Sequence, residues 1–399
     1  MPKSLFIHYL FLFWAFVQYP LACVVKIDAG AKMCGLACVS YYIYLFLSNK
    51  DFRTVAKSFF SVIWLALVCY HIWNSVDLKV KFEMGHSLLF FKAFLCYFVM
   101  ILSAFLFKID AKRAFSVCVV SFYVYMFCSL SVMSVDESFG GRIKGGVHPN
   151  QLAQCAGMFM MLMACRKNMY GISLGKVLQI CIVPFIIMLY CGSRNGLLLL
   201  GFFGLTLCMS SLLTKGLSTK KLFLFLCGGL FAIVFTYFVM SHTMVGERML
   251  ATKSQAESVQ LKSGTILDYL GDRGWYYIVG WDMFLQSPVR GIGYYNFRNF
   301  NVHDLPLHSE YMMNICEGGI IAVVLYFSFL LRMLFTRIKS FRKQKTPLSF
   351  SLLMSLLAYM AIGLTAREFI YSPFYPVLGL ILYSNISEKN ERKSIRCYK

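Results

Sequence analysis

Residues 86–107 read HSLLFFKAFLCYFVMILSAFLF, a stretch in which Lys92 is the only Lys, Arg, Asp or Glu. The hydrocarbon core of a bilayer is about 30 Å thick and is crossed by about 20 apolar residues in a helix. The stretch therefore predicts a transmembrane helix. The whole chain has the same character, because 59% of its 399 residues are hydrophobic and only 14% are charged. Such a composition is typical of a protein whose solvent is the bilayer.

Comparable apolar stretches lie on both sides of this one, and together they predict about twelve transmembrane helices. We place them at residues 5–25, 31–48, 56–75, 86–107, 114–134, 150–165, 174–191, 196–213, 222–241, 311–332, 348–366 and 370–385. The predicted fold class is all-α, a polytopic membrane protein. Its predicted parts are helices one to nine in residues 1–241, a loop domain with short helices in 242–310, and three helices with a basic tail in 311–399.

The basic residues predict the orientation of the chain. Most of the 39 Lys and Arg residues fall in short segments next to alternate spans, where they resist translocation. Examples are Lys50 to Lys57, Lys108 to Arg113, Arg332 to Lys345, and the tail from Lys389. Both termini are therefore predicted to be cytoplasmic and the 242–310 loop to be outside. Short clusters beside apolar spans indicate contacts with lipid headgroups. The net charge of +21 thus does not predict a nucleic-acid partner.

The loop domain is the one long segment between predicted spans. Within it, Asp272 can cap a helix from Arg273 to Gln286 that ends before Ser287-Pro288. Its apolar residues Trp275, Ile278, Val279 and Met283 share one face at helical spacing, which would lie against the bundle or the lipid interface.

Three basic residues near the predicted outer edge are candidates for function, since charges there persist with a partner or a substrate. Arg194 lies in a very short outer turn, Arg273 opens the loop helix, and His308 lies where the chain re-enters the membrane. Each has an ordinary alternative: Arg194 as an arginine that extends to the headgroups, Arg273 as a surface charge, and His308 as an interfacial histidine.

Their order along the chain resembles the O-antigen ligase and O-antigen polymerase superfamily of bacterial membrane glycosyltransferases. The residues that carry the resemblance are His148-Pro149-Asn150, Gly192-Ser193-Arg194 with Leu198, Gly271-Asp272-Arg273, Ser287-Pro288-Val289-Arg290-Gly291-Ile292-Gly293-Tyr294, His308-Ser309-x-Tyr311 and Glu317-Gly318-Gly319. One departure is Ala322, where the ligases typically have a second small or glycine position.

The resemblance implies a GT-C-like enzyme of the bacterial inner membrane with its active site facing the periplasm. The donor would be an undecaprenyl-diphosphate-linked glycan and the acceptor either lipid A core or another lipid-linked glycan. It implies catalytic roles for His308, Arg194 and Arg273, and substrate binding by Tyr311, Arg290, His148 and Asn150. No cofactor is implied. No Asp-x-Asp pair occurs on an outer loop, so we expect no metal site and a metal-independent reaction.

Several alternatives remain open at this stage. We favour a ligase, which uses lipid A core, over a polymerase, which joins lipid-linked repeat units. A flippase for lipid-linked sugars would share the spans and arginines, but transporters usually carry ionisable groups near the midplane. The loop aromatics either stack on sugar rings or anchor the loop at the interface; they include Trp275, Tyr276, Tyr277, Tyr294, Tyr295 and Phe297.

The predicted topology can be tested with reporter fusions. A reporter fused after residue 260 should be active as a periplasmic domain, and one fused near Lys343 as a cytoplasmic domain, because the basic clusters oppose translocation. The measurement is paired phosphatase and fluorescence activity in intact cells. Activity of both fusions in one compartment would contradict the twelve-span topology.

Overall fold

A computed structural model gives the fold. It describes residues 3–25, 28–78, 84–132, 134–136, 142–144, 148–191, 193–215, 272–300, 306–366 and 372–397. The predicted span at 222–241 and about half of the predicted loop domain, residues 242–271 and 301–305, lie outside these residues.

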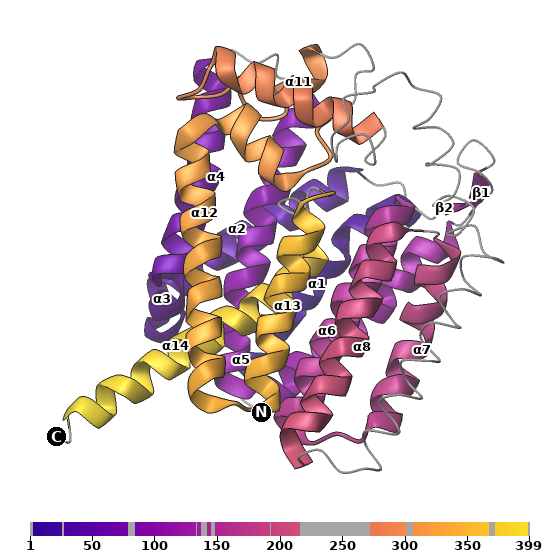
Figure 1. Cartoon of the computed structure of the whole chain (residues 1–399), viewed down its shortest axis with the longest axis vertical. Coiled ribbons are helices and arrows are strands. Elements are labelled where there is room, and N and C mark those ends of the chain that lie inside the picture. The colour runs from indigo at the N-terminus through magenta and orange to yellow at the C-terminus, as the bar shows by residue number, and fades with distance from the viewer. Residues whose placement is uncertain are drawn as a thin grey trace. The chain divides into compact units, whose positions relative to one another are not determined.

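Helices make up nearly all of the described structure (Figure 1). The first part of the chain forms α1 (Lys3–Val25), α2 (Asp28–Ser48), α3 (Lys50–Ala56), α4 (Phe59–Asp77) and α5 (Met84–Ser131). The middle forms β1 (Ser134–Asp136), β2 (Arg142–Lys144), α6 (Pro149–Tyr170), α7 (Leu174–Tyr190) and α8 (Arg194–Lys215). The last part forms α11 (Asp272–Gln286), η3 (Asn296–Phe300), α12 (Glu310–Gln344), α13 (Pro347–Gly363), η4 (Ser372–Phe374) and α14 (Tyr375–Cys397).

The all-α class is confirmed, with one small addition. β1 and β2 form an antiparallel pair in a region for which no strand was predicted. Four of the described helices are long and apolar enough to cross a membrane, and they lie at Phe59–Asp77, Lys92–Ser131, Arg194–Leu213 and Glu310–Gln344. Shorter apolar helices lie at Leu5–Gln18, Leu36–Ser48, Leu174–Tyr190 and Pro347–Gly363. An integral membrane protein is therefore supported, and the number of twelve spans stays a prediction.

The chain divides into two compact units. Unit 1 contains residues 1–132, 280–338 and 359–399, and unit 2 contains residues 133–279 and 339–358. Each unit is built from segments that are distant in the sequence. Unit 1 therefore brings the start of α12, which carries the predicted site residue Tyr311, together with helices from the first third of the chain.

The helix α5 is broken at Asp110, whose φ of −149° and ψ of 84° are not helical. The Asp110 carboxylate accepts a hydrogen bond from the Arg113 N–H at 3.2 Å and so caps the second half. The rings of Phe107 and Phe115 lie 4.9 Å apart, whereas eight residues of continuous helix would separate them by about 12 Å. The chain therefore turns back at Asp110, which separates the two predicted spans at 86–107 and 114–134.

Contacts within unit 1 place this turn, the start of α3 and the start of α4 at one end. Lys108 forms an ion pair with Asp51 at 2.6 Å. The guanidinium of Arg332 lies 3.7 Å from the centre of the Phe59 ring, which brings the second half of α12 to the same end. This basic end contains residues that the sequence assigns to the cytoplasm. The opposite end of unit 1, where α4 finishes beside the first part of α12, is called the His308 end below, after the residue that precedes α12.

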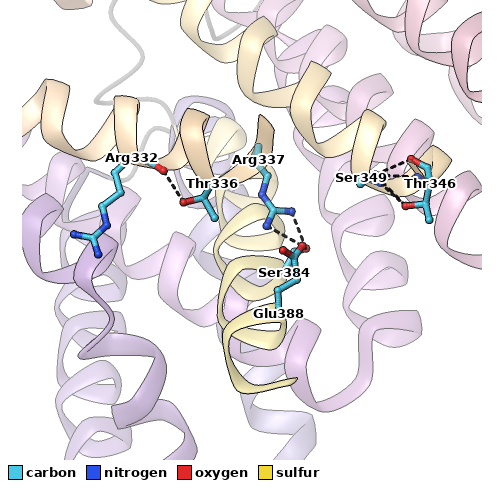
Figure 2. Close-up of polar contacts among 7 residues, drawn as sticks. All are labelled: Arg332, Thr336, Arg337, Thr346, Ser349, Ser384 and Glu388. Carbon is cyan, nitrogen blue, oxygen red and sulfur yellow. Dashed lines mark hydrogen bonds and ion pairs between the residues drawn. The ribbon is translucent and has the colours of Figure 1, made fainter. Parts of the chain in front are cut away.

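A buried ion pair joins α12 to α14 within unit 1 (Figure 2). Arg337 is completely buried and donates to the Glu388 carboxylate at 2.9 Å and to the Ser384 hydroxyl at 3.0 Å. A charge without its partner would be very costly in such surroundings, so this pair fixes the register of the two helices. Closer to the start of α14, Gly379 lets the helix pack on α5, because a Cβ there would lie 2.6 Å from that of Ser103.

Unit 2 contains three helices that pack around small residues. A Cβ at Gly196, in the first turn of α8, would lie 3.3 Å from the Ala153 Cβ of α6 and 3.6 Å from the Met188 Cβ of α7. The helix α13 starts with a reciprocal cap in which Thr346 and Ser349 each accept the other's backbone N–H at 3.2 Å (Figure 2).

The loop helix is confirmed as α11, which begins one residue earlier than predicted and ends at Gln286 as expected. Ile278, Val279 and Met283 of its predicted apolar face are partly exposed, whereas Tyr276 and Gly280 are buried. The position of this apolar face against the bundle or the lipid interface stays a prediction. The burial of Gly280 was not predicted, because glycine adds no hydropathy to the apolar pattern.

Candidate functional site

The site at the His308 end is organised around a break in α12. Gly319 has φ 60° and ψ −165°, a backbone conformation that is open essentially to glycine alone. The helix therefore stops there and restarts, which separates a short first segment, residues 310–318, from the rest of α12. In an apolar environment, such a break leaves backbone groups that need new hydrogen-bond partners.

The loop after α11 supplies these partners. The N–H groups of Ile292 and Gly293 donate to the carbonyl oxygens of Cys316 and Glu317, each at 3.0 Å. These carbonyls would otherwise accept bonds from the next turn of an unbroken helix. The loop thus completes the first segment of α12 and is fixed to it by backbone geometry.

Two glycines make this close approach possible. A Cβ at Gly319 would lie 2.5 Å from the Val289 carbonyl oxygen and 2.6 Å from the Gly291 nitrogen. A Cβ at Gly291 would lie 2.6 Å from the carbonyl oxygen of Cys316. Beyond the break, the Ile320 N–H donates to the Pro288 carbonyl at 2.8 Å, so the loop is bound on both sides of Gly319.

Side chains of α4 hold the same assembly from the other side. The Tyr70 hydroxyl donates to the Gly318 carbonyl at 2.9 Å, and the Asn74 amide donates to the Arg290 carbonyl at 2.7 Å and to the Glu317 carbonyl at 3.4 Å. Polar residues in an apolar span usually face a partner inside the bundle. Here their partners are the carbonyls around the helix break.

Arg290, a predicted substrate-binding residue, is placed against the last turns of α4. Its guanidinium donates to the Asp77 carboxylate at 2.5 Å and to the Asn74 side-chain oxygen at 3.2 Å. It also lies 4.6 Å from the centre of the Trp73 ring, at cation–π distance. These contacts neutralise its charge and join the loop to α4, and the substrate-binding role stays a prediction.

A buried polar stripe on the first segment of α12 was missed by sequence reasoning. Glu310, Asn314 and Glu317 follow at spacings of four and three residues and are fully buried. The Asn314 side-chain oxygen lies 3.1 Å from Nε2 of His71, a buried histidine of α4. The signal was present in the sequence, since polar residues at helical spacing inside an apolar span predict a functional or packing partner.

His308 lies immediately before α12 and is exposed. Tyr311, in the first turn, is partly exposed, and its hydroxyl donates to the Met360 carbonyl of α13 at 2.7 Å. Its ring stacks on that of Phe327 with the centroids 5.7 Å apart. Tyr311 therefore has a packing role beside the predicted substrate contact. Within unit 1, Arg290 lies beside the last turns of α4, whereas Tyr311 packs on Phe327 in the second part of α12.

The other predicted site residues belong to unit 2. Arg194 is the first residue of α8 and is exposed, with neither an ion pair nor a hydrogen bond to any described residue. A cation at a helix N-terminus is disfavoured by the helix dipole unless an anion is bound there. Arg273 lies in the first turn of α11, and its side chain lies outside the described residues.

His148 and Asn150 have a local structural explanation. His148 is the N-cap of α6, and its Nδ1 accepts a hydrogen bond from the Asn150 N–H at 3.2 Å. Pro149 occupies the first helical position, where its missing N–H costs nothing. The His-Pro-Asn sequence therefore starts a helix, and its predicted contact with substrate stays a prediction.

Comparison with known proteins identifies the segment that carries most of these residues. Residues 179–327 match the family model described as O-antigen ligase. The resemblance to the O-antigen ligase and O-antigen polymerase superfamily is confirmed. The matched segment includes Arg194, Arg273, Arg290, His308 and the helix break of α12, and it contains parts of both units. No curated protein matches the chain.

The helix break can be tested by adding one methyl group. Gly319→Ala should lower the melting temperature of the purified protein strongly, because φ near 60° is unfavourable for alanine and the Cβ would overlap Val289. We expect a loss of about 3 kcal/mol or more in the free energy of unfolding, typical of a strained, overpacked position.

Gly201→Ala is the matched control for this substitution. Gly201 lies within α8, and a Cβ there would meet nothing within 4 Å. Alanine should therefore preserve or raise stability through its higher helix propensity. Equal melting temperatures for the two variants would show that the conformation at Gly319 is not required.

Proposed function

We propose that the chain transfers an undecaprenyl-diphosphate-linked glycan to a sugar hydroxyl at the periplasmic face of the bacterial inner membrane. The observation that carries the proposal is the O-antigen ligase match over residues 179–327, which contains the two candidate arginines and the candidate histidine. The exposure of Arg194 and His308 supports it, because groups that act on a substrate must be accessible.

The reaction breaks the bond between the anomeric carbon and the diphosphate oxygen and forms a bond to the acceptor oxygen. The diphosphate leaves with the electron pair of the broken bond, so its negative charge increases in the transition state. In this proposal Arg194 and Arg273 stabilise that charge, since a planar guanidinium can donate to two phosphate oxygens at once. The amide groups at the start of the loop helix α11 add further donors beside Arg273.

His308 is proposed as the base that takes the proton of the acceptor hydroxyl. An imidazole is suited to this step because its ordinary pKa lies close to neutral pH. Tyr311 and Arg290, which also belong to unit 1, are proposed to border the acceptor site, while His148 and Asn150 are proposed to contact the donor. We propose further that the reaction needs no metal ion and no cofactor.

The acceptor decides between the two members of the superfamily. We favour a ligase, whose acceptor is the lipid A core, and the family model bears the description of the ligase. A polymerase that joins lipid-linked repeat units is the alternative. A lipid-linked sugar flippase is a third candidate, and it would move the donor without breaking the bond to the diphosphate.

Deletion of the gene should separate these functions, with lipopolysaccharide banding as the measurement. Loss of a ligase should leave bare core and accumulated lipid-linked polymer, and loss of a polymerase should leave core with a single repeat. Alleles with Arg194→Lys or Arg273→Lys should fail to restore the banding, because lysine keeps the charge but loses bidentate donation.

Arg342→Lys and membrane immunoblotting provide controls for charge geometry and insertion. Arg342 is an exposed residue near the end of α12 that is assigned to no substrate, so this allele should restore the banding. Full restoration by both the Arg194 and the Arg273 lysine alleles would contradict the assignment of the diphosphate contact.

The role of His308 can be tested with purified donor and acceptor in detergent. His308→Ala should lower the transfer rate by about 10² to 10⁴-fold, the usual contribution of a positioned base. His308→Gln keeps a hydrogen bond but cannot take up the proton, so it should be nearly as slow. EDTA should leave the wild-type rate unchanged. A wild-type rate for the Gln variant would remove His308 as the base, and inhibition by EDTA would contradict the metal-independent reaction.

A further inference from the structure

The aromatic residues of the loop after α11 fall into two groups. Tyr294 and Phe297 are almost completely buried, and the Tyr294 N–H donates to the Ser75 hydroxyl of α4 at 2.9 Å. These two residues anchor the loop to the bundle. Tyr295, between them, is partly exposed.

Tyr295 has an unusual backbone conformation. Its φ of 63° lies in the left-handed region, which is uncommon for a residue with a Cβ and is readily adopted by glycine. Glycines occur in left-handed conformations at Gly291 and Gly293 of the same loop, so glycine is used where only the turn matters. A tyrosine at such a position indicates that its side chain is needed, because strained residues cluster at functional sites.

A buried carboxylate holds Tyr295 in this conformation. One oxygen of Glu317 accepts the Tyr295 N–H at 2.8 Å, and the other accepts the Phe297 N–H at 3.4 Å. Glu317 is fully buried, and buried carboxyl oxygens need hydrogen-bond donors such as these. A glutamate inside an apolar helix is thus used to fix the backbone on both sides of Asn296.

The turn that follows brings a cation to the tyrosine. Arg298, in η3, lies with its guanidinium carbon 5.5 Å from the centre of the Tyr295 ring, and it is also partly exposed. An aromatic ring with an arginine beside it offers a hydrophobic face and a cationic donor at one point of the surface. The C–H faces of sugar rings pack on aromatic rings, and arginine binds carboxylate or phosphate groups.

We propose that Tyr295 and Arg298 form an acceptor subsite for a saccharide that carries a carboxylate or phosphate group. This inference rests on the proposed glycan transfer. The first segment of α12 connects the proposed base with the proposed subsite. His308 precedes the N-terminus of the segment, and Glu317, near its C-terminus, holds Tyr295. Its residues 310–318 span about 12 Å, the length of a short oligosaccharide. The subsite therefore recognises the acceptor away from the reacting hydroxyl.

Tyr295→Gly removes the aromatic ring but keeps the backbone conformation, so it tests the role of the ring apart from that of the fold. Glycine adopts the left-handed conformation without strain, so the melting temperature should equal or exceed that of the wild type. Loss of the ring should raise the KM for the acceptor about tenfold, the usual size of one aromatic contact, with little change in kcat or in the KM for the donor. Tyr295→Phe should restore the wild-type KM. Arg298→Gln should raise the KM for the acceptor and reduce its dependence on salt.

The assay uses the full-length protein in detergent with lipid-linked donor and purified lipopolysaccharide that has core but no O antigen. If the wild type does not use this lipopolysaccharide as an acceptor, the lipid-linked repeat unit is used as the acceptor in its place. Phe300→Ala is the matched control, because Phe300 is an exposed aromatic residue of the same turn with no role in the subsite. It should keep the wild-type KM.

Three results would overturn the proposal in different ways. An unchanged acceptor KM for Tyr295→Gly would make the ring an interfacial anchor, while the proposed function would stand. A lower melting temperature for this variant would show that the tyrosine is retained for stability. Absence of transfer by the wild type with both acceptors would overturn the proposed function itself, and the acceptor subsite with it.

Discussion

Backbone N–H and carbonyl groups in an apolar environment must find hydrogen-bond partners within the protein, and this constraint determines the structure at the His308 end of unit 1. An unbroken α12 would satisfy its own carbonyls, but the break at Gly319 releases those of Cys316 and Glu317. The backbone N–H groups of the loop after α11 donate to these two carbonyls, and this pairing determines the conformation of the loop. Glycine is needed at 291 and 319 because the two backbones meet with no room for a Cβ. One interruption of one helix thus fixes the course of a loop from another part of the chain.

The same requirement explains why polar residues occur inside apolar spans. Tyr70 and Asn74 of α4 donate to carbonyls beside the break, and Arg290 is held between Asn74 and Asp77. These side chains therefore have structural partners, which explains their presence without a translocation pathway. The resulting polar layer lies at the end of unit 1 where α4 finishes, apart from the buried Arg337–Glu388 ion pair further along α12.

The sequence predicted the parts of the structure that depend on local pattern. Apolar length predicted the long helices, a cap and a Ser-Pro end predicted α11, and the order of the motifs indicated the superfamily. The sequence could not show long-range partners: Arg290, for example, pairs with Asp77, which lies 213 positions earlier in the chain. The contact of Gly280 was not predicted either, because it depends on the lack of a side chain. The buried stripe from Glu310 to Glu317 was visible in principle, but its partner His71 could be found only in three dimensions.

Glu317 shows how structure and chemistry depend on each other in this fold. Its backbone carbonyl is one of the groups released by the helix break, and its carboxylate fixes the strained turn at Tyr295. Any residue could accept the first bond through its backbone carbonyl, so this contact does not require a glutamate. The carboxyl group is explained by the second contact, because both of its oxygens face backbone N–H donors, whereas an amide would place its NH2 group against one of them. A buried side chain thus orients the partly exposed Tyr295, which is the arrangement expected where a protein recognises a ligand.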